Sequence, residues 1–474
     1  MSMSFGDIVK FLDEQVAWGP VILVLLVGVG LYFSIRTRFV QFRKLGYALK
    51  NTVGKVFKKT RAEKGELTPW QSMTTALAAT VGTGSIVGVT GAVAIGGPGA
   101  IFWMWVSALV GMVTKYAEVV LAVHYRERNE KGERVGGPMY YIKNGLGPKW
   151  KWLAVIFCLF GILASFGIGN ATQVNSIASS VEGSLSAFGV TSDNITFLGS
   201  TFSVIRLITG IVLAVIIALV VIGGLKAIGK ITEMMVPFMS IVYILAGVVF
   251  VVFNYSQVGK AFGMIFEGAF NPSSVIGGAA GATILTVMQK GISRGCFSNE
   301  AGLGSAPIAH ASTSETNPVK QGMYGIFEVF ITSMIICTIT GLVLLCGHNA
   351  GNITIGWGSG ADGVLVAESM GSVFGERLSM LVVSICLILF SLSTIISWSL
   401  YGTRCFEFIA NSKVIFIYKI IFVLFVVVGA TLRLDVAWSM ASAFNGFMAI
   451  PNLVAILLLS PVVFRLTKEY FDRK

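Results

Sequence analysis

The stretch LAATVGTGSIVG, at residues 77–88, interrupts a long apolar segment with glycines on both sides of a threonine. Glycine in a helix interior costs about 1 kcal/mol relative to alanine, so Gly82 and Gly84 favour local unwinding around Thr83. Unwound backbone inside a membrane is tolerated only where it is buried in protein or lines a cavity. Its amides suit a carboxylate and its carbonyls suit a cation. The alternative interpretation is close packing of helices through small residues.

A second interrupted stretch, TVMQKGISRGCFSNEAGLGS at residues 286–305, lies in the second half of the chain. Its centre is polar and rich in glycine, although apolar residues surround it. Charged residues at such a depth usually face the interior of a helix bundle or water. We interpret 275–312 as one broken span. The alternative, a cytoplasmic loop between two short spans, would reverse every later helix and disturb the charge distribution described below.

The composition of the whole chain is typical of an all-α polytopic membrane protein. Of its 474 residues, 55% are hydrophobic and only 12% are charged, against roughly 25% charged in an average soluble protein, and the mean hydropathy is +0.80. These values exclude a soluble fold and a disordered chain. A β-barrel is disfavoured because its strands are alternating segments of about 10 residues. Eleven segments are long enough to span a membrane, and a short interfacial helix over 5–18 precedes them: they lie near 18–35, 71–95, 100–122, 152–181, 203–224, 231–253, 275–312, 324–347, 376–401, 414–432 and 439–464.

Motifs of other functional classes are missing from the sequence. The six cysteines and three histidines are scattered, which argues against a disulfide framework and a zinc site. No Walker A, HExxH or Gly-x-Ser-x-Gly motif occurs, so we expect neither an enzyme nor direct use of ATP, and no cofactor. An ion channel would show a pore-lining ring or filter, and none is visible.

The basic residues predict the orientation of the chain. Most of the 35 lysines and arginines lie in alternate loops and in the C-terminal tail, and an excess of positive charge marks the cytoplasmic side. We expect a multi-pass protein of the plasma membrane with its N-terminus outside and its C-terminus in the cytoplasm. The net charge of +12 then reflects the topology in the membrane and not binding of nucleic acid. Membrane lipid is the expected surface partner of these basic residues. The basic residues expected outside are Lys10, Arg206, Lys260, Arg377 and Arg433.

The two interrupted segments are the second and the seventh spans, five apart. Spans two to six and seven to eleven then form two sets of five, and an odd number of spans inverts the second set in the membrane. Paired interruptions at corresponding positions are the best sequence sign of a transporter site. The expected regions are an N-terminal part with the interfacial helix, an extra span and a basic linker (1–66), a first repeat (67–255), a second, inverted repeat (256–466) and a cytoplasmic tail (467–474).

The stretch GGPGAIFWMWV at residues 96–106, with Gly111 and Met112 beyond it, closely resembles the signature of the sodium:alanine (alanine/glycine:cation) symporter family. TVGTGS at 80–85 and GCFSNEAGLG at 295–304 are similar to that family too. The resemblance implies the leucine-transporter fold of five plus five inverted helices with one extra helix in front. It also implies sodium-coupled uptake of alanine or glycine. The residue patterns alone indicate only an ion-coupled transporter of a small zwitterion, and proton coupling through Glu118, Glu233 or Glu300 is the alternative.

The resemblance places the unwound turn of the first core helix at 81–85, where the amides of Thr83 and Gly84 would bind the substrate carboxylate. Carbonyls near 291–295 would bind the ammonium group. Phe166 and Asn170 are four residues apart and thus on one face of the fourth span. Asn170 could accept from the ammonium group, or could instead form an interhelical hydrogen bond, and Phe166, Ile292 or Phe297 would limit the room at the α-carbon. The predicted substrate-binding residues are Thr80, Thr83, Gly84, Ser85, Phe166, Asn170, Gln289, Gly291, Ile292, Gly295 and Phe297.

A run of hydroxyl residues in the ninth span favours a sodium site, because sodium takes neutral oxygen ligands. The predicted ligands are the carbonyls of Ala78 and Val81 with the hydroxyls of Ser393 and Thr394, or of Ser391 and Thr394. The alternative is that these hydroxyls bond to their own helix. On the third span, Lys115 and Glu118 are three residues apart and could pair with each other.

Overall fold

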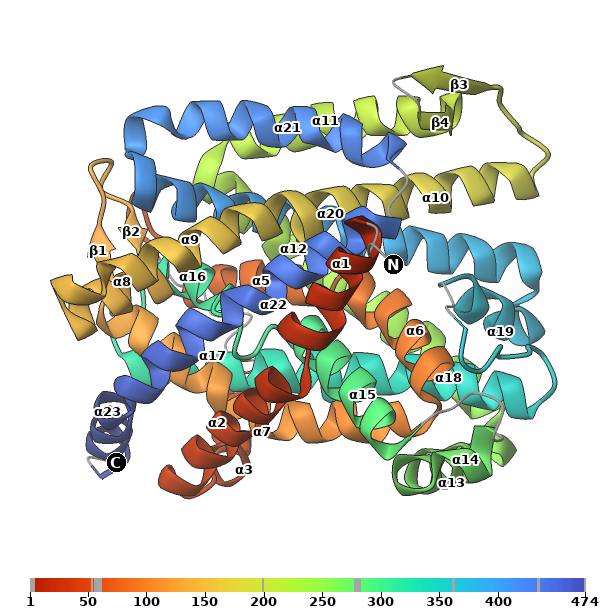
Figure 1. Cartoon of the computed structure of the whole chain (residues 1–474), viewed down its shortest axis with the longest axis horizontal. Helices are drawn as coiled ribbons and strands as arrows, with labels where there is room; N and C mark the ends of the chain where they lie inside the picture. Colours follow the sequence, from red (N-terminus) through yellow and green to blue (C-terminus); the bar gives the residue numbers. More distant parts are fainter. Residues whose placement is uncertain are drawn as a thin grey trace.

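The computed structural model of the chain describes all residues except 1–4, 53, 55–61, 198–199, 277–282, 360–362, 433–434 and 473–474. Most of the long helices run along one direction (Figure 1). One end of the molecule carries the antiparallel strands β1 (Glu127–Arg128) and β2 (Arg134–Val135), and the other end carries β3 (Asn194–Phe197) and β4 (Ser200–Ser203). Parts of the predicted basic linker, of the span 275–312 and of the tail, and also Arg433, lie outside the described residues.

The helices are, in order, α1 (Phe5–Phe11), α2 (Pro20–Arg36), α3 (Val40–Arg43), α4 (Leu45–Thr52), α5 (Pro69–Thr80), α6 (Val87–Gly96), α7 (Gly99–His124), α8 (Pro138–Tyr141), α9 (Lys151–Phe166), α10 (Thr172–Ala187), α11 (Val204–Ile222), α12 (Gly224–Phe253), α13 (Tyr255–Phe270), α14 (Pro272–Ile276), α15 (Ile284–Asn299), α16 (Ala306–Ala311), α17 (Pro318–Val329), α18 (Thr338–Asn349), α19 (Val364–Phe374), α20 (Glu376–Ala410), α21 (Ile415–Thr431), α22 (Asp435–Leu458) and α23 (Ser460–Asp472). Wider, π-helical turns extend α1 over Leu12–Ala17, join α9 to α10 over Gly167–Ala171, and join α17 to α18 over Phe330–Cys337.

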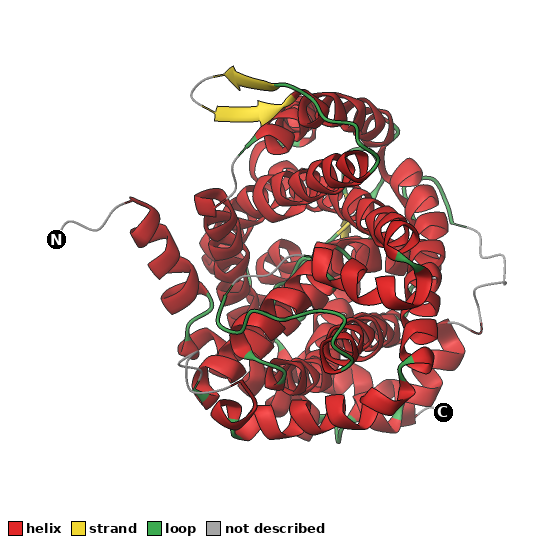
Figure 2. Cartoon of the chain, turned by 90° about the vertical axis from the view of Figure 1, so that its right-hand side faces the viewer, coloured by secondary structure: helices red, strands yellow, loops and turns green. Residues whose placement is uncertain are grey.

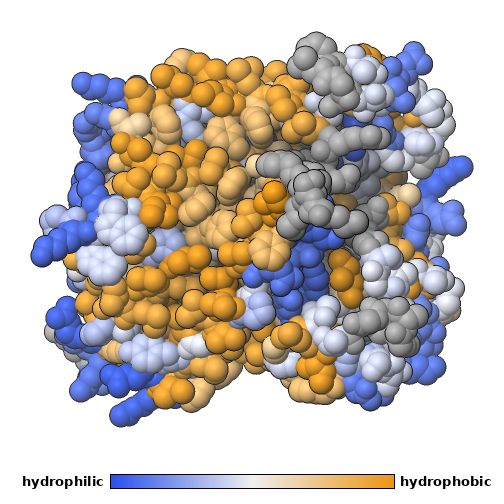
Figure 3. Space-filling view, viewed as in Figure 1, coloured by the Kyte–Doolittle hydropathy of each residue, from blue (hydrophilic) through white to orange (hydrophobic). Residues whose placement is uncertain are grey.

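The surface has the distribution of polarity that a membrane requires. Apolar residues form a broad band across the middle of the face in Figure 3, and hydrophilic residues gather at its two ends. Within the described residues, nine helices are long and apolar enough to cross a membrane, and the bent pair α5–α6 makes a tenth. These correspond to ten of the eleven predicted spans. The span predicted over 275–312 is formed by α15 and α16, which are shorter and more polar, so the count of eleven is not confirmed.

Two groups of helices enclose the broken helix α5–α6. In one group, α15 and α17 pack on α7; in the other, α20 packs on α9 and α10, and α11 packs on α21. The first group lies low and the second high in Figure 1, with α5 and α12 between them, and α5 contacts α12, α16 and α20. Seen from the end that carries β3 and β4, the helices form a closed bundle (Figure 2), and residues 80–86 of the interruption are all buried. The interruption of α5–α6 is therefore surrounded by protein.

The second interruption lies at the C-terminal end of the predicted stretch 286–305. Helix α15 continues without a break through 291–295 to Asn299, and the chain unwinds only over 300–305 before α16. Three residues there have positive φ angles: 54° at Glu300, 88° at Gly302 and 81° at Gly304. Glycine adopts that conformation without steric cost. The interruption therefore lies within the predicted stretch, but the carbonyls near 291–295, which were expected to be free, belong to a continuous helix.

Candidate functional site

Helix α5 begins with a strong cap and ends deep inside the molecule. The hydroxyl of Thr68 accepts from the amide of Gln71, and the Gln71 side chain accepts from the amide of Thr68. The helix stops at Thr80, and α6 resumes at Val87 with a bend of 59° between the two parts. Carbonyls in the last turn of a helix have no helical amide to bind. The interruption predicted at 77–88 is confirmed, and it leaves such carbonyls at its centre.

One of these carbonyls, that of Ala78, meets the hydroxyl pair of α20. The hydroxyl of Thr394 lies 3.0 Å and that of Ser393 lies 3.3 Å from the Ala78 oxygen. Both hydroxyls also bond to the carbonyl of Phe390 in their own helix, at 2.9 Å. A Cβ atom built on Gly82 would lie only 2.5 Å from the Thr394 hydroxyl oxygen. The end of α5, Gly82 and α20 thus converge on one group of oxygens.

Further buried oxygens around this point have no hydrogen-bond partner among the described residues. They include the hydroxyl of Thr83 and the amide oxygen of Gln173, and the latter lies 3.6 Å from the Cβ position on Gly82. Of the two serines predicted to share the site with Thr394, Ser393 contacts the carbonyl of Ala78. The hydroxyl of Ser391 is buried and has no hydrogen-bond partner among the described residues. Val81 is fully buried at the turn itself. Buried oxygens without donors are an arrangement that a cation can stabilise.

The other side of the α5–α6 interruption faces the end of α15. The hydroxyls of Ser85 and Ser298 are 3.1 Å apart, and a Cβ atom on Gly84 would lie 3.2 Å from the ring of Phe297. The chain at Gly84 can approach this ring because glycine has no side chain. Of the residues predicted on α15, Phe297 is the one that these contacts bring to the interruption.

A row of hydroxyls on α17–α18, absent from the sequence-based prediction, completes this wall. Thr340 donates to the carbonyl of Ser85 at 2.9 Å, Asn299 donates to Ser333 at 3.0 Å, and the hydroxyl of Thr332 lies 3.5 Å from that of Thr80. The signal was present in the hydroxyl-rich run at 332–340, which has the same character as the run on α20.

The other predicted residues of α15 pack against neighbouring helices. A Cβ atom on Gly291 would lie 2.5 Å from the carbonyl oxygen of Ala100, and one on Gly295 would lie 2.1 Å from the Ser107 hydroxyl. These glycines let α15 lie close against α7. The side chains of Gln289 and Ile292 turn toward the N-terminal segment. Gln289 donates to the carbonyls of Glu14 and Trp18 at 2.8 and 3.1 Å, and Ile292 lines a hollow with α2.

Phe166 and Asn170 share one face of α9 and its extension, as predicted from their spacing, and that face contacts α21. The Phe166 ring packs against the rings of Tyr418, Phe422 and Phe425, with centroids 5.3 to 5.8 Å apart. The Asn170 amide donates to the carbonyl of Phe422 at 2.8 Å. None of these contacts joins either residue to the α5–α6 interruption.

Carboxylates hold the unwound segment 300–305. Glu300 accepts from Ser305 at 2.6 Å and from the indole of Trp398 at 3.2 Å. Glu118 accepts from the amide of Gly304 at 3.1 Å and from the side chain of Asn452. Glu233, the third carboxylate considered for proton coupling, accepts from Gln71 at 2.8 Å, near the start of α5.

Lys115 does not pair with Glu118, because its partner is Glu328 on α17, at 3.3 Å. Glu328 also contacts the imidazole of His310 at 3.0 Å, and all three side chains are fully buried. The prediction of a Lys115–Glu118 pair is therefore wrong. The ion pair instead joins α7 to α17.

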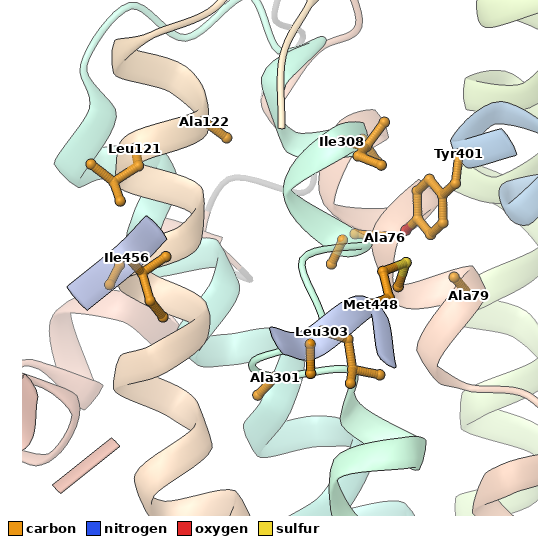
Figure 4. Close-up of a cluster of buried hydrophobic side chains, with 14 of the residues drawn as sticks. Ala76, Ala79, Leu121, Ala122, Ala301, Leu303, Ile308, Tyr401, Met448 and Ile456 are labelled. Atoms are coloured by element: carbon orange, nitrogen blue, oxygen red, sulfur yellow. The ribbon is translucent and has the colours of Figure 1, made fainter. Parts of the chain in front are cut away.

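Apolar packing and a polar hairpin close the end of the bundle that carries β1 and β2. Ala76, Leu303, Ile308, Tyr401 and Met448 belong to one buried cluster and come from α5, the unwound segment, α16, α20 and α22 (Figure 4). Beyond them, Glu133 in the hairpin bonds to Arg404 of α20 at 2.7 Å. Burial alone would raise the pKa of Glu133, but the charge of Arg404 and the hydrogen bonds from Arg404 and Asn129 together outweigh burial and hold that pKa below its usual value.

Comparisons with known proteins agree with this architecture. The solved structure of MhsT in complex with L-phenylalanine superposes with a TM-score of 0.59 at 12% sequence identity, over 86% of this chain and 99% of that one. This similarity shows the leucine-transporter fold. Among curated proteins, the sodium/alanine symporter AgcS of Methanococcus maripaludis is 44% identical over 99% of this chain and 98% of its own length. The amino-acid carrier protein AlsT of Bacillus subtilis is 36% identical over 95% and 89%.

The family assignment follows from the sequence match over nearly the full length. A model of the sodium:alanine symporter family matches residues 3–474, in accordance with the resemblance seen in the motifs. The fold and the family also exclude an enzyme. The chain belongs to the sodium:alanine symporter family, and it is a multi-pass membrane transporter that carries an amino acid together with a cation.

Proposed function

We propose that the chain imports alanine and glycine together with Na⁺ by alternating access. The observation that carries this proposal is the convergence of the Ala78 carbonyl with the hydroxyls of Ser393 and Thr394 beside Gly82. In alternating access, a site opens first to one side of the membrane and then to the other. The interruption of α5–α6 is suited to this, because it lies between the two groups of helices.

The donor set fits sodium. Na⁺ takes the carbonyls of Ala78 and Val81 with the hydroxyls of Ser393 and Thr394, and the unpartnered oxygens of Thr83 and Gln173 are near enough to the same turn to contribute. All of these ligands are neutral, so a monovalent cation requires no proton release on binding. The name of the relative from Methanococcus, a sodium/alanine symporter, supports this choice of ion.

The substrate lies on the opposite side of the same turn. The amides of Thr83 and Gly84 bind its carboxylate, and Ser85 and Ser298 provide hydroxyls beside it. Because the backbone recognises groups that every amino acid has, selectivity comes from the room around the α-carbon. The ring of Phe297 against Gly84 restricts that room, and a clash excludes a large side chain more strongly than a gap excludes a small one.

The orientation and the internal symmetry belong to the same proposal. The end with the β1–β2 hairpin faces the cytoplasm, as the basic loops predict, so the C-terminus is inside and the N-terminus outside. The repeats 67–255 and 256–466 are inverted relative to each other, with α5–α6 and α15–α16 as their corresponding broken helices.

Uptake into proteoliposomes tests the proposal. Purified protein should accumulate radiolabelled alanine and glycine when a sodium gradient is imposed, and leucine should not compete. A proton gradient in sodium-free buffer should drive no uptake. Uptake driven by a proton gradient would instead support proton coupling through Glu118 or Glu300, which contact the unwound segment. Charge-neutral variants of these two residues would then identify which carboxylate carries the proton.

A further inference from the structure

A pocket at the end of the extra helix α2 is lined mainly by basic side chains. It lies between the end of α2, the short helix α3 and the C-terminal helix α23, and its volume is about 290 Å³. That volume is close to the lower end of the range of small-ligand sites, about 300–1,000 Å³. We call it the basic pocket, and its lining includes Arg36, Arg38, Arg43, Phe464, Lys468 and Asp472. Helix α23 lies at the end of the molecule that carries β1 and β2 (Figure 1).

The basic pocket has a large excess of positive charge. Its charged lining residues are Arg36, Arg38, Arg43 and Lys468, with Asp472 as the carboxylate among them. All five side chains are exposed, and none of them forms an ion pair with another described residue. The described part of the chain therefore leaves several converging cations for an anion to neutralise.

Aromatic rings of α23 hold two of the cations at the basic pocket in place. The guanidinium of Arg36 lies 5.2 Å from the centre of the Phe464 ring, and the ammonium group of Lys44 lies 4.7 Å from the centre of the Phe471 ring. A cation over the face of a ring is attracted by its quadrupole. These contacts join two segments that are far apart in the sequence, so the basic groups are positioned before any ligand binds.

The basic pocket lies where a membrane span ends. The apolar helical segment Gly6–Arg36 stops at the pocket, and its last turns expose Leu31 and Ile35. Directly after it, the exposed rings of Phe39 and Phe42 stack with their centroids 6.2 Å apart. Basic side chains beside exposed apolar side chains are typical of a segment that lies at the surface of a membrane. The basic pocket is therefore at the depth of the lipid headgroups.

We propose that the basic pocket binds the phosphate group of an anionic phospholipid whose acyl chains lie against Phe39 and Phe42. The guanidinium groups of Arg38 and Arg43 donate to the phosphate oxygens, a pairing that the planar guanidinium suits well, and Lys468 adds a third cation from α23. An anionic headgroup is favoured over a zwitterionic one, because an ammonium group would bring a further positive charge to a pocket that already has an excess.

The bound lipid would join α2, which lies outside the two proposed repeats, to the C-terminal helix. The orientation given under the proposed function puts this lipid in the cytoplasmic leaflet, whose anionic lipids attract basic segments. The charges and contacts of the basic pocket depend neither on sodium nor on the amino acid.

Native mass spectrometry tests this site, because it counts the lipid molecules bound to each copy of the purified full-length protein. In a titration, phosphatidylglycerol should bind more tightly than phosphatidylcholine with the same acyl chains. The variants Arg43→Gln and Lys468→Gln should each weaken binding of the first phosphatidylglycerol about 5-fold, which is the effect of one basic residue near an anionic surface. Asp472→Asn should strengthen it. Inorganic phosphate, which has no acyl chains, should displace the lipid poorly.

The matched control is Arg465→Gln, which removes an exposed positive charge from the same helix, α23, but outside the lining of the basic pocket. It should bind phosphatidylglycerol like the wild type. In detergent without lipid, Arg43→Gln and Lys468→Gln should unfold at the temperature of the wild type, so that weaker binding reports on the pocket and not on the fold.

Three results would overturn the proposal. Equal binding of phosphatidylcholine and phosphatidylglycerol would show that the positive charge selects no headgroup. An equal loss in Arg465→Gln and Arg43→Gln would show that the basic surface attracts lipid diffusely. Displacement of the lipid by inorganic phosphate at the lower concentration would make the basic pocket a site for a soluble anion. Because these measurements use neither sodium nor alanine, failure of the proposed transport would leave their outcome unchanged.

Discussion

The substitution Gly82→Ala tests the sodium site most directly, because it adds a single carbon at a known position. The new Cβ atom would lie 2.5 Å from the hydroxyl oxygen of Thr394, and contacts below about 3.0 Å do not persist in folded proteins. The backbone at this residue is extended, with φ near −119°, so alanine itself fits the conformation. The clash must therefore be relieved by moving Thr394 and the turn apart by about half an ångström.

That movement separates the Thr394 hydroxyl from the carbonyl of Ala78, which it now approaches to 3.0 Å. Adding a carbon to a tightly packed interior costs about 1–3 kcal/mol. If the sodium-bound protein must recover the original geometry, the free energy of sodium binding becomes less favourable by this amount. The concentration of sodium that half-saturates alanine binding should then rise roughly 5- to 140-fold.

The assay is sodium titration of radiolabelled alanine binding to the purified protein, with the thermal unfolding temperature measured in parallel. Gly88→Ala is the matched control, since a Cβ atom on Gly88 in α6 would meet no atom of the described residues within 4 Å; it should titrate like the wild type. A Gly82→Ala variant with unchanged sodium dependence would refute the placement of sodium between α5 and α20. A variant that only unfolds earlier would show that the contact matters for packing alone.

Three further results are expected. Thr394→Ala should raise the sodium requirement of uptake and Thr394→Ser should restore it, because only the hydroxyl is needed; equal loss in both would point to the methyl group and to packing. Phe297→Ala should let leucine compete with labelled alanine. The ring of Phe166 lies against α21, so Phe166→Ala should leave the range of competing amino acids unchanged. The reverse pattern would show that Phe166, and not Phe297, limits the size of the substrate. The pKa of Glu133 is held below its usual 4.5. Its pair with Arg404 therefore stabilises the fold above pH 4.5 and loses this effect as the pH falls through the lower pKa of the folded state. Between about pH 6 and about pH 3 the unfolding temperature should fall less for Glu133→Gln than for the wild type, and equal falls would contradict this.

The sequence alone determined the features that depend on local composition. Ten spans, the interruption after Thr80 and the hydroxyl pair of α20 follow from hydropathy, from glycine content and from spacing along one helix. Ala78 and Thr394 were chosen as partners because the resemblance placed their helices together. Their contact at 3.0 Å agrees with that choice, although the ion itself stays a prediction.

Only the tertiary structure decided which role each ambiguous residue has. Glycine serves both unwinding and close packing, and nothing within residues 286–305 distinguishes the two. The proximity of α7 makes Gly291 and Gly295 packing residues, and the support from Glu118 and Glu300 makes 300–305 the unwound segment. In the same way, spacing placed Phe166 and Asn170 on one face, but the neighbour of that face, α21, is set by long-range packing. A helix specifies which residues share a face, and the helices around it specify what that face meets.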